Sequence, residues 1–547
     1  MKQTYVIGVD YGSDSVRAVI VEALTGRQIS QGTADYPRWK KGWYTHPEEM
    51  IFRQHPLDYL EALEKSIKEA LAELPESVKG RIVGISVAAT GSTPAPVNRE
   101  GTPLALLDGF RENENAMFYL WKDHSAVLEA IELNHIFSAG TEIDYTKYQG
   151  TYSAEWYWAK ILHGIRKDPA VREAAYTWVE HCDWIVGVLC GNRNPETLLR
   201  SACAAGHKAL WHSEWNGLPE RACLEMADPY LCKIAERYKA TPKAGGTAAG
   251  PLTTEWCEKL GLLSGVMVSA GSFDAHAGAV GAGIRPKTLV CTLGTSAADM
   301  LIAKPETLEG ADITNYCGQA ENSIVDGYIG IETGQAAFGD TFAWFRELLL
   351  WPVRQFKSSL YEDEDGRHSL CDELERHLFS ALEEAAEALP WNLFPVSSDW
   401  FNGRRYPDAD DFQKAAINGL TLGTTAPEIY RSLVLGTLCG LKRIIDGLEA
   451  SGLEIEQIAA IGGISKKSGY IMQTMADLLE KKVAILDTDQ TCALGAAIYA
   501  AVGAGEYEDV ETAMRHMAAK KIREYVPQKE NSLRYLEYYK EYCKMAE

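Results

Sequence analysis

Two short stretches far apart in the chain repeat one pattern: a β-branched strand, a glycine turn rich in hydroxyl groups, and a second strand. The first spans residues 6–21 and reads VIGVDYGSDSVRAVIV, and the second spans 289–303 and reads LVCTLGTSAADMLIA. They turn at Gly12 and at Gly294, respectively. A repeat of this kind favours a fold with two similar halves, each of which contributes one hairpin.

The two turns have the composition of anion-binding loops. When they are aligned on their glycines, Ser13 falls on Thr295 and the apolar run 18–21 falls on 300–303. Hydroxyls and free backbone N–H groups at a glycine turn form a cradle for phosphate oxygens. Each turn alone is also compatible with an ordinary hairpin, because short motifs give many false positives. The repetition, with Asp10 beside the first turn, favours two loops that hold a nucleotide tail between them.

The size and charge of the chain restrict its partners. At 547 residues it is too long for one core and should form at least two domains. Its net charge of −22 argues against non-specific binding to nucleic acid or to an anionic membrane. That charge is compatible with an anionic nucleotide, since local backbone amides and a few cations dominate inside a cleft.

The sequence also predicts a cytoplasmic protein. It has no N-terminal apolar run of the signal-peptide type and no apolar stretch long enough to span a bilayer. The twelve cysteines form no CxxC pair and no zinc-like spacing with histidine. We interpret them as reduced thiols, most of them in the core.

Strand-like and helix-like segments alternate along the chain, which predicts an α/β architecture. A helical pattern over 56–74 is followed by a strand over 82–87, and a further helix is expected from about 334 to 350. Glycine and proline cluster over 278–287, which we interpret as a linker. The predicted domains are therefore residues 1–282 and 283–547.

A third glycine element follows the buried strand 458–461. Gly462 and Gly463 stand where this strand leads into a helix, and paired glycines there let the backbone approach a flat ligand such as adenine, or a ribose. A turn required only for close packing is an equally good interpretation. The chain has no GxxxxGK[ST] sequence and no GxGxxG fingerprint at its first strand, so neither a P-loop nor a Rossmann motif is expected.

Two aspartates are candidates for chemistry. Asp274 lies in a GSFDAH loop, where a carboxylate can orient a hydroxyl nucleophile and accept its proton, or can instead cap the helix 275–282. Asp10 can form a turn or hold Mg²⁺ through water, and its place beside a phosphate turn favours the metal role. His207 and His276 have no accompanying ligand set and are interpreted as polar or packing residues.

The motifs in their order along the chain resemble the FGGY carbohydrate kinases, which share a superfamily with the Hsp70 ATPase domain and actin. The matching stretches are DYGSDSVR at 10–17, the Asp274 loop, LGTSAAD at 293–299, GGISKKSGYIMQTMAD at 462–477 and CALGAAIYAA at 492–501. The resemblance covers nearly the whole chain. It implies two ribonuclease-H-like α/β domains flanking a deep cleft, with the sugar deep inside and ATP nearer the mouth.

The resemblance also implies roles for individual residues. Asp274 would be the catalytic base and Asp10 the carboxylate associated with Mg²⁺. The residues implied to bind ATP are Gly12, Ser13, Asp14, Gly294, Thr295, Ser296, Gly462, Gly463 and Ser468. The residues implied to bind the sugar are Thr90, Ser92, Trp121, Lys122, Asp123, Lys208 and Asp274 itself.

Some of these positions keep a second interpretation. Trp121 is also compatible with a core aromatic residue, and Lys208 with a surface cation. Glu332 and Gln335 can line the nucleotide side or stabilise a helix start.

Within the family the chain is most similar to the ribulokinases. The stretches that carry this similarity are 36–44, 89–97, 116–127, 201–212, 331–340 and 399–405. They imply ATP-dependent phosphorylation of L-ribulose to L-ribulose 5-phosphate, a step of L-arabinose catabolism. Alternatives are a kinase of another ketopentose or pentitol, such as xylulose or ribitol, and a non-enzymatic nucleotide-switched module. The oligomeric state stays open, with a homodimer as one option.

Two positions depart from the pattern of that group. Ala88 stands where other ribulokinases can carry an acidic residue, and Ser468 stands where asparagine is common in the adenosine motif. The first departure affects which group contacts that part of the sugar. The second affects how strictly the base is recognised.

Overall fold

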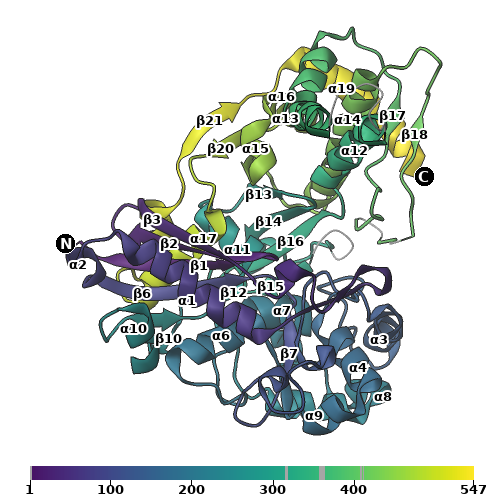
Figure 1. The fold of residues 1–547 in the computed structure, drawn as a ribbon. Helices are drawn as coiled ribbons and strands as arrows, with labels where there is room; N and C mark the ends of the chain where they lie inside the picture. The colour runs from purple at the N-terminus through teal and green to yellow at the C-terminus, as the bar shows by residue number, and fades with distance from the viewer. Residues whose placement is uncertain (1–2, 314–317, 356–363, 407–408, 411, 547) are drawn as a thin grey trace.

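The structure is a computed structural model that describes residues 3–313, 318–355, 364–406, 409–410 and 412–546. Two seven-stranded sheets organise it, and helices cover them (Figure 1). The N-terminal half forms the lower body in that view, and much of the C-terminal half forms the upper lobe. Among the described residues, no helix has both the length and the apolar character that a membrane crossing requires.

The first sheet has the order β10-β11-β6-β1-β2-β3, and β12 pairs with β6. Strand β1 runs antiparallel to β2 and parallel to β6. The bounds are β1 Tyr5–Tyr11, β2 Ser15–Glu22, β3 Gln28–Asp35, β6 Ile82–Ala89, β10 Ala248–Pro251, β11 Met267–Ser269 and β12 Ser272–Phe273.

The second sheet repeats this plan in the order β15-β16-β14-β13-β19-β20-β21. Strand β13 runs antiparallel to β14 and parallel to β19, as β1 does to β2 and β6. The bounds are β13 Thr288–Leu293, β14 Ala297–Ala303, β15 Gly318–Glu321, β16 Ile329–Gln335, β19 Gln457–Ile461, β20 Lys482–Leu486 and β21 Lys521–Tyr525. The predicted α/β fold with two similar halves, each containing one glycine hairpin, is confirmed.

The strand register corrects one detail of the predicted repeat. In the first hairpin Tyr11 pairs with Val16, whereas in the second Leu293 pairs with Ala297, so the second turn is one residue shorter. Strand β2 therefore corresponds to β14 with a shift of one residue relative to the alignment on the glycines. The run 18–21 falls on 299–302 and not on 300–303.

A pair of helices, α11 (Asp274–Gly281) and α17 (Thr491–Gly503), packs tightly together and joins the two halves. Glycine makes the crossing close, because a Cβ on Gly495 would collide with the carbonyl of Ala277. Helix α17 also packs on β1 and β6, although it lies far along the chain. The predicted linker 278–287 is wrong in its first part, since α11 continues to Gly281.

Further helices pack around the two sheets. Helix α1 packs on β2 and β3, and α14 and α16 pack together and enclose the core of the second half. Their bounds, with those of further helices, are α1 Pro56–Ala72, α3 Val127–Ala139, α4 Tyr157–Lys167, α6 His181–Cys190, α7 Ala202–Ala209, α12 Gly339–Gln355, α13 Glu364–Ala388, α14 Ala426–Ala450, α15 Gly463–Lys467, α16 Gly469–Leu479, α18 Val510–Met517 and α19 Lys529–Ala546.

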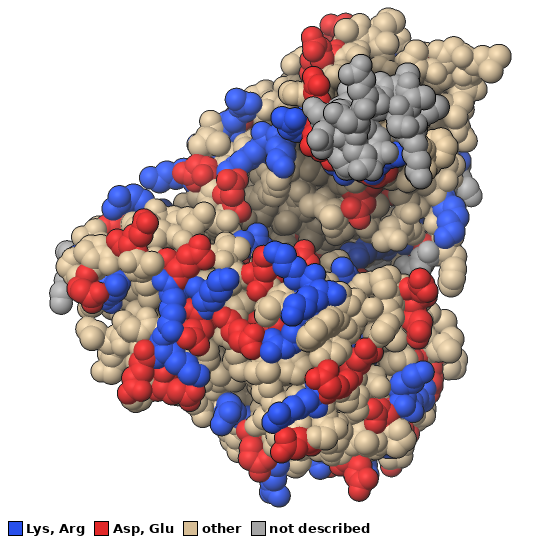
Figure 2. Space-filling model, viewed as in Figure 1, with Lys and Arg blue, Asp and Glu red and all other residues tan. Residues whose placement is uncertain are grey.

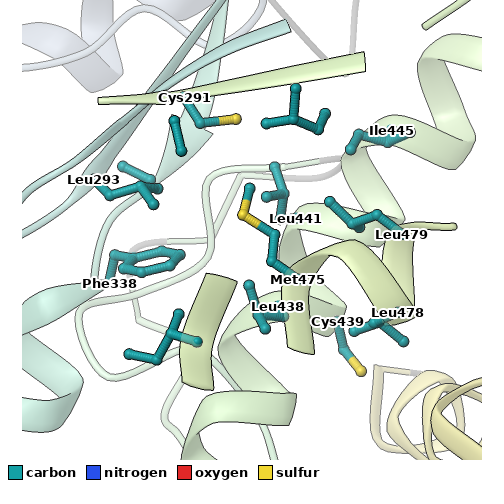
Figure 3. Close-up of a cluster of buried hydrophobic side chains, with 14 of the residues drawn as sticks. Cys291, Leu293, Phe338, Leu438, Cys439, Leu441, Ile445, Met475, Leu478 and Leu479 are labelled. Atoms are coloured by element: carbon teal, nitrogen blue, oxygen red, sulfur yellow. The ribbon is translucent and has the colours of Figure 1, made fainter. Parts of the chain in front are cut away.

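The hydrophobic core of the second half anchors its glycine hairpin. One buried cluster contains Cys291 and Leu293 of β13 together with Phe338 and with Leu438 and Leu441 of α14 (Figure 3). All five side chains are buried. Burial of apolar surface contributes about 25 cal/mol per Å², so this packing holds the adjacent turn in place.

Candidate functional site

A hollow lies between the lower body and the upper lobe (Figure 2). In the first sheet, the parallel strands β1, β6 and β12 bring their carboxyl ends to one edge of the sheet. In the register of that sheet Asp10 of β1 stands beside Ala88 of β6, which stands beside Ser272 of β12. Asp274 follows two residues after Ser272. The two predicted aspartates therefore come from distant parts of the sequence to one sheet edge.

Asp274 is the first residue of α11, and Phe273 occupies the N-cap position. One Asp274 oxygen, Oδ1, accepts a hydrogen bond from the Ala275 N–H at 2.7 Å. Burial, and then the negative charge of Asp10, raise the pKa of Asp274 to about 7. A carboxyl group with that pKa can accept a proton near neutral pH and is a good general base.

Asp10 is paired across the hairpin. Its Oδ2 lies 2.9 Å from the Arg17 guanidinium, which comes from the directly opposite position on β2. Burial raises the pKa of Asp10, although Arg17 opposes that shift. The second carboxylate oxygen, Oδ1, is buried and has no hydrogen-bond partner among the described residues. Arg17 was not among the predicted site residues, although it is the lone cation on the mostly buried strand β2.

Side-chain donors hold the first turn in place. The Trp121 indole N–H donates to Ser13 Oγ at 2.9 Å, and the Gln54 amide donates to the Ser13 carbonyl at 2.7 Å. The Trp39 indole N–H donates to Asp14 Oδ1 at 2.6 Å. Trp121 therefore reaches the predicted phosphate loop, 108 residues away in sequence.

Backbone groups at the start of α12 hold the second turn. The Gly339 N–H donates to the Gly294 carbonyl at 3.0 Å, and the Phe338 N–H donates to the Thr295 carbonyl at 2.8 Å. Gly294 and Thr295 are exposed, and Ser296 is partly exposed. These groups can therefore meet a ligand in the cleft.

The third loop lies against this second hairpin. Gly462 has φ = 92°, and a Cβ there would stand 2.5 Å from the Leu293 carbonyl oxygen, whereas Gly463 faces open space. Ser468 is buried and caps α16 by accepting the Ile471 N–H at 3.0 Å. The predicted nucleotide-binding positions of the second half thus lie on two adjoining loops.

A cluster of charged and aromatic groups connects the two halves. Lys208 of α7 donates to both carboxylate oxygens of Glu332 on β16, at 2.9 and 3.1 Å. The buried imidazoles of His207 and His276 lie 3.6 and 3.7 Å from the same carboxylate. Burial alone would raise the pKa of Glu332, but Lys208 and then the two histidines lower it below its usual range. The charge of Glu332 also contributes to the raised pKa of Asp274, so the cluster lies near the catalytic candidate.

Among the described residues, His207, His276 and Glu332 are the one group with the spacing of a metal site. Lys208 already neutralises Glu332. A divalent cation there would have to displace that ammonium group, so we interpret the cluster as a polar lining of the cleft.

The interpretation of Glu332 and Gln335 as residues at a helix start is wrong. Both lie on strand β16, and α12 begins only at Gly339. The Gln335 amide donates to Asp399 at 2.7 Å and to the Thr437 carbonyl at 2.9 Å, inside the second half.

Four predicted sugar-binding residues have other contacts. Ser92 is fully buried and donates its hydroxyl to Glu180, and Thr90 Oγ1 lies 3.3 Å from Thr93 Oγ1. The Lys122 ammonium lies over the rings of Phe52 and Trp39, at 4.8 and 5.2 Å from their centroids.

Asp123 is also fully buried, with its carboxylate on the Arg53 guanidinium and on the Phe52 N–H. Its charge is therefore neutralised inside the protein. Neither Asp123 nor Ser92 presents a free polar group to the cleft.

Comparisons with known proteins agree with this geometry. Residues 289–504 match the C-terminal domain of the FGGY family of carbohydrate kinases. A ribulokinase from Vibrio parahaemolyticus is 43% identical over 96% of this chain and 92% of its own length, and one from Shouchella clausii is 34% identical over 99% and 94%.

Solved structures share the fold at low sequence identity. A xylulose kinase from Rhodospirillum rubrum superposes with a TM-score of 0.77 at 19% identity, covering 99% of this chain and 98% of its own. A glycerol kinase from Plasmodium falciparum gives 0.75 at 15% identity, covering 99% and 98%. The full-length sequence similarity, together with the doubled sheet and its two glycine hairpins, shows that this chain belongs to the FGGY family of carbohydrate kinases.

Proposed function

We propose that the protein transfers the γ-phosphoryl group of ATP to the terminal hydroxyl of L-ribulose, giving L-ribulose 5-phosphate and ADP. The observation that carries this proposal is the position of Asp274, whose raised pKa and place beside Asp10 suit it to accept a hydroxyl proton. The similarity to ribulokinases over nearly the full length supports the choice of sugar.

In the proposed reaction Asp274 accepts the proton as the hydroxyl oxygen attacks the γ-phosphorus. The new P–O bond forms while the bond between the γ-phosphorus and the β–γ bridging oxygen breaks, and ADP leaves with that electron pair. Catalysis of this kind is mostly positioning and charge stabilisation. Arg17 is well placed to keep Asp10 ionised, since its guanidinium opposes the effect of burial.

The residues beside the first turn fit Mg²⁺, the cation that usually binds ATP in phosphoryl transfer. The buried Asp10 Oδ1 has no hydrogen-bond partner among the described residues, and a carboxylate oxygen is a ligand that this hard cation prefers. When bound, Mg²⁺ neutralises charge on the phosphates. Asp10 would then hold it directly or through water.

The proposed sugar contacts come from both halves of the chain. Lys208 and Glu332 present a cation and a carboxylate that suit the donors and acceptors of a ketopentose. We assign Trp121 to the support of the first turn, because its N–H is engaged by Ser13. Asp123 and Ser92 are likewise assigned to supporting the site rather than to contacting the sugar, since both are enclosed.

The nucleotide is proposed to lie across the exposed turns of the second half. Gly294, Thr295 and Ser296 would hold phosphates, with Gly12, Ser13 and Asp14 on the opposite side. Gly462, Gly463 and Ser468 would contact the adenosine. The open space at Gly463 supports this, because a base or ribose can approach the backbone there.

A panel of sugars tests the proposal directly. ADP release is measured with L-ribulose, D-ribulose, L-xylulose, D-xylulose, ribitol and arabitol, each with MgATP. We expect the highest kcat/KM with L-ribulose. A higher value with xylulose or ribitol would replace the sugar but keep the reaction, whereas ATP hydrolysis that no sugar stimulates would overturn the kinase assignment.

Three further properties are proposals of the same kind. We assign the chain to the cytoplasm and to two domains over 1–282 and 283–547, and we keep a homodimer as one option for its oligomeric state. Light scattering on the purified protein measures its molar mass in solution, and the mass of a monomer would contradict a homodimer.

A further inference from the structure

A lysine that has no role in the proposed reaction contacts the backbone of two segments next to the proposed sugar site. Lys160 of α4 is completely buried, and its ammonium group donates to the Ser92 carbonyl at 2.7 Å and to the Leu120 carbonyl at 2.8 Å. The carbonyls of Trp121 and Tyr119 lie at 3.3 and 3.4 Å. One cation therefore ties together two segments that are separated in sequence, residues of the turn after β6 and the end of β8 (Phe118–Tyr119).

A buried carboxylate holds the same turn from the other side. Glu180 accepts the Thr93 N–H at 2.7 Å and the hydroxyl of Ser92. Burial lowers the pKa of Lys160 and raises that of Glu180, and the attraction between the two groups opposes both shifts. Burying a charge is costly unless other groups compensate it, and here backbone carbonyls accept from the ammonium group while Glu155 and Glu180 supply opposite charge nearby.

The two tied segments both reach the proposed site. Trp121 donates to Ser13 in the first phosphate turn at 2.9 Å. Thr90, at the start of the other segment, donates its N–H to the carbonyl of Tyr11, the last residue of β1. The position of Lys160 therefore affects the first hairpin and the turn after β6 together.

We propose that Lys160 is a positioning residue of the kinase: its ammonium group fixes residues 90–93 and 119–121 so that the wall of the sugar site is preformed. The inference rests on the proposed function. It differs from a purely structural role, which would lower stability without changing how well sugar is bound.

The test compares two fully buried cations of the same half. Lys160→Met removes the ammonium group and keeps the unbranched side chain as far as Cε. Arg200→Met is the matched control, because Arg200 is equally buried but contacts Asp183 and the Pro195 carbonyl, not residues of the site. For each variant the sugar KM, kcat, the Kd of ATP and the melting temperature are measured with the best substrate of the sugar panel.

We expect Lys160→Met to raise the sugar KM by about tenfold and to lower kcat, since several hydrogen bonds to a charged group are lost. The Kd of ATP should change little, because the adenosine is assigned to the third loop. Arg200→Met should lower the melting temperature by a similar amount and leave the sugar KM as in the wild type. An unchanged sugar KM in Lys160→Met, or an equal rise in Arg200→Met, would overturn the inference.

Glu180→Gln serves as a second variant if Lys160→Met does not fold. It keeps the shape and one acceptor of the Glu180 side chain but removes the charge that faces Lys160, so a smaller rise in the sugar KM is expected. A wild-type sugar KM in a folded Glu180→Gln would contradict the inference in that case. The wild-type panel is run first: absence of any sugar-stimulated ADP release defeats the proposed function, whereas an active wild type with unaffected variants defeats only the role of Lys160.

Discussion

The two glycine hairpins have the same topology but different chemistry. In β1–β2 the residues that face each other beside the turn are Asp10 and Arg17, which form an ion pair. In β13–β14 the equivalent residues are Thr292 and Ala298. One hairpin therefore brings charge to the cleft, and the other brings only backbone amides and hydroxyls.

The second hairpin does contain an acid, but it lies on the other face of its strand. Asp299 pairs with Cys291 and is completely buried, and burial raises its pKa to about 7. It is therefore no counterpart of Asp10. The repeated fold supplies two turns that can bind phosphate. The carboxylates proposed for the reaction, Asp10 and Asp274, both lie in the first half. This asymmetry is expected when one side of a cleft binds the attacking hydroxyl and the other binds the leaving nucleotide.

The largest effect is expected from removing the proton acceptor on the charged side. Asp274→Asn keeps the shape of the side chain but cannot accept the hydroxyl proton, so kcat should fall by about 10²- to 10⁴-fold. The Kd of ATP should change little, because Asp274 is assigned to the sugar hydroxyl and is not among the residues assigned to the nucleotide. Sugar-stimulated ADP release and a nucleotide titration measure the two quantities, and a folded variant with near wild-type turnover would refute the role of Asp274.

Equivalent substitutions in the two hairpins test their asymmetry. Asp10→Asn removes a charge beside the proposed phosphate site and should lower kcat by about 10²-fold. Thr292→Val, the nearly isosteric change at the matching place, should leave kcat almost unaffected. Steady-state kinetics at saturating MgATP, with melting curves to exclude unfolding, give the comparison. Equal losses in both variants would mean that the charge of Asp10 is not the relevant difference.

The pH dependence of kcat/KM for the sugar should also differ between substitutions in the two hairpins. Asp274 must be ionised to act as a base, and its pKa is raised to about 7 by burial and by Asp10. Below that pH, kcat/KM for the sugar should rise about tenfold per pH unit and then level off above it. Asp10→Asn removes the charge that disfavours ionisation, so the inflection should move to lower pH, whereas Thr292→Val should not move it. An inflection near pH 4 in the wild type would contradict the assignment.

The sequence predicted the parts of the site that depend on local pattern. Both hairpins, the third glycine loop and the loop of Asp274 follow from short-range signals, namely glycine turns, β-branched strands and strand-to-loop transitions. The pairing of Asp10 with Arg17 could also have been predicted, because the two residues are close in sequence and face each other in a hairpin.

Contacts that depend on tertiary packing were not predictable in this way. Lys208 and Glu332 are 124 residues apart and meet only because α7 packs on the second sheet. The segment around Gly334 was expected to be helical, whereas pairing with β14 makes it a strand. Trp121 similarly reaches Ser13 through packing, and no local pattern indicates which way its indole points.

The smallest expected effect concerns the junction between the second hairpin and the third loop. Gly462 has a positive φ, and a Cβ there would stand 2.5 Å from the Leu293 carbonyl oxygen, so Gly462→Ala should destabilise the protein by about 1–3 kcal/mol. Gly463→Ala meets open space and should leave stability almost unchanged, but its methyl group would occupy the space proposed for adenosine.

Denaturant unfolding and the KM for ATP, measured on both variants, distinguish the two positions. A stability loss confined to Gly462→Ala and a KM increase in a stable Gly463→Ala would place the nucleotide against the uncharged hairpin. If Gly463→Ala kept both the stability and the KM of the wild type, the third loop would serve only to pack against Leu293. The adenosine would then have to bind somewhere other than the third loop.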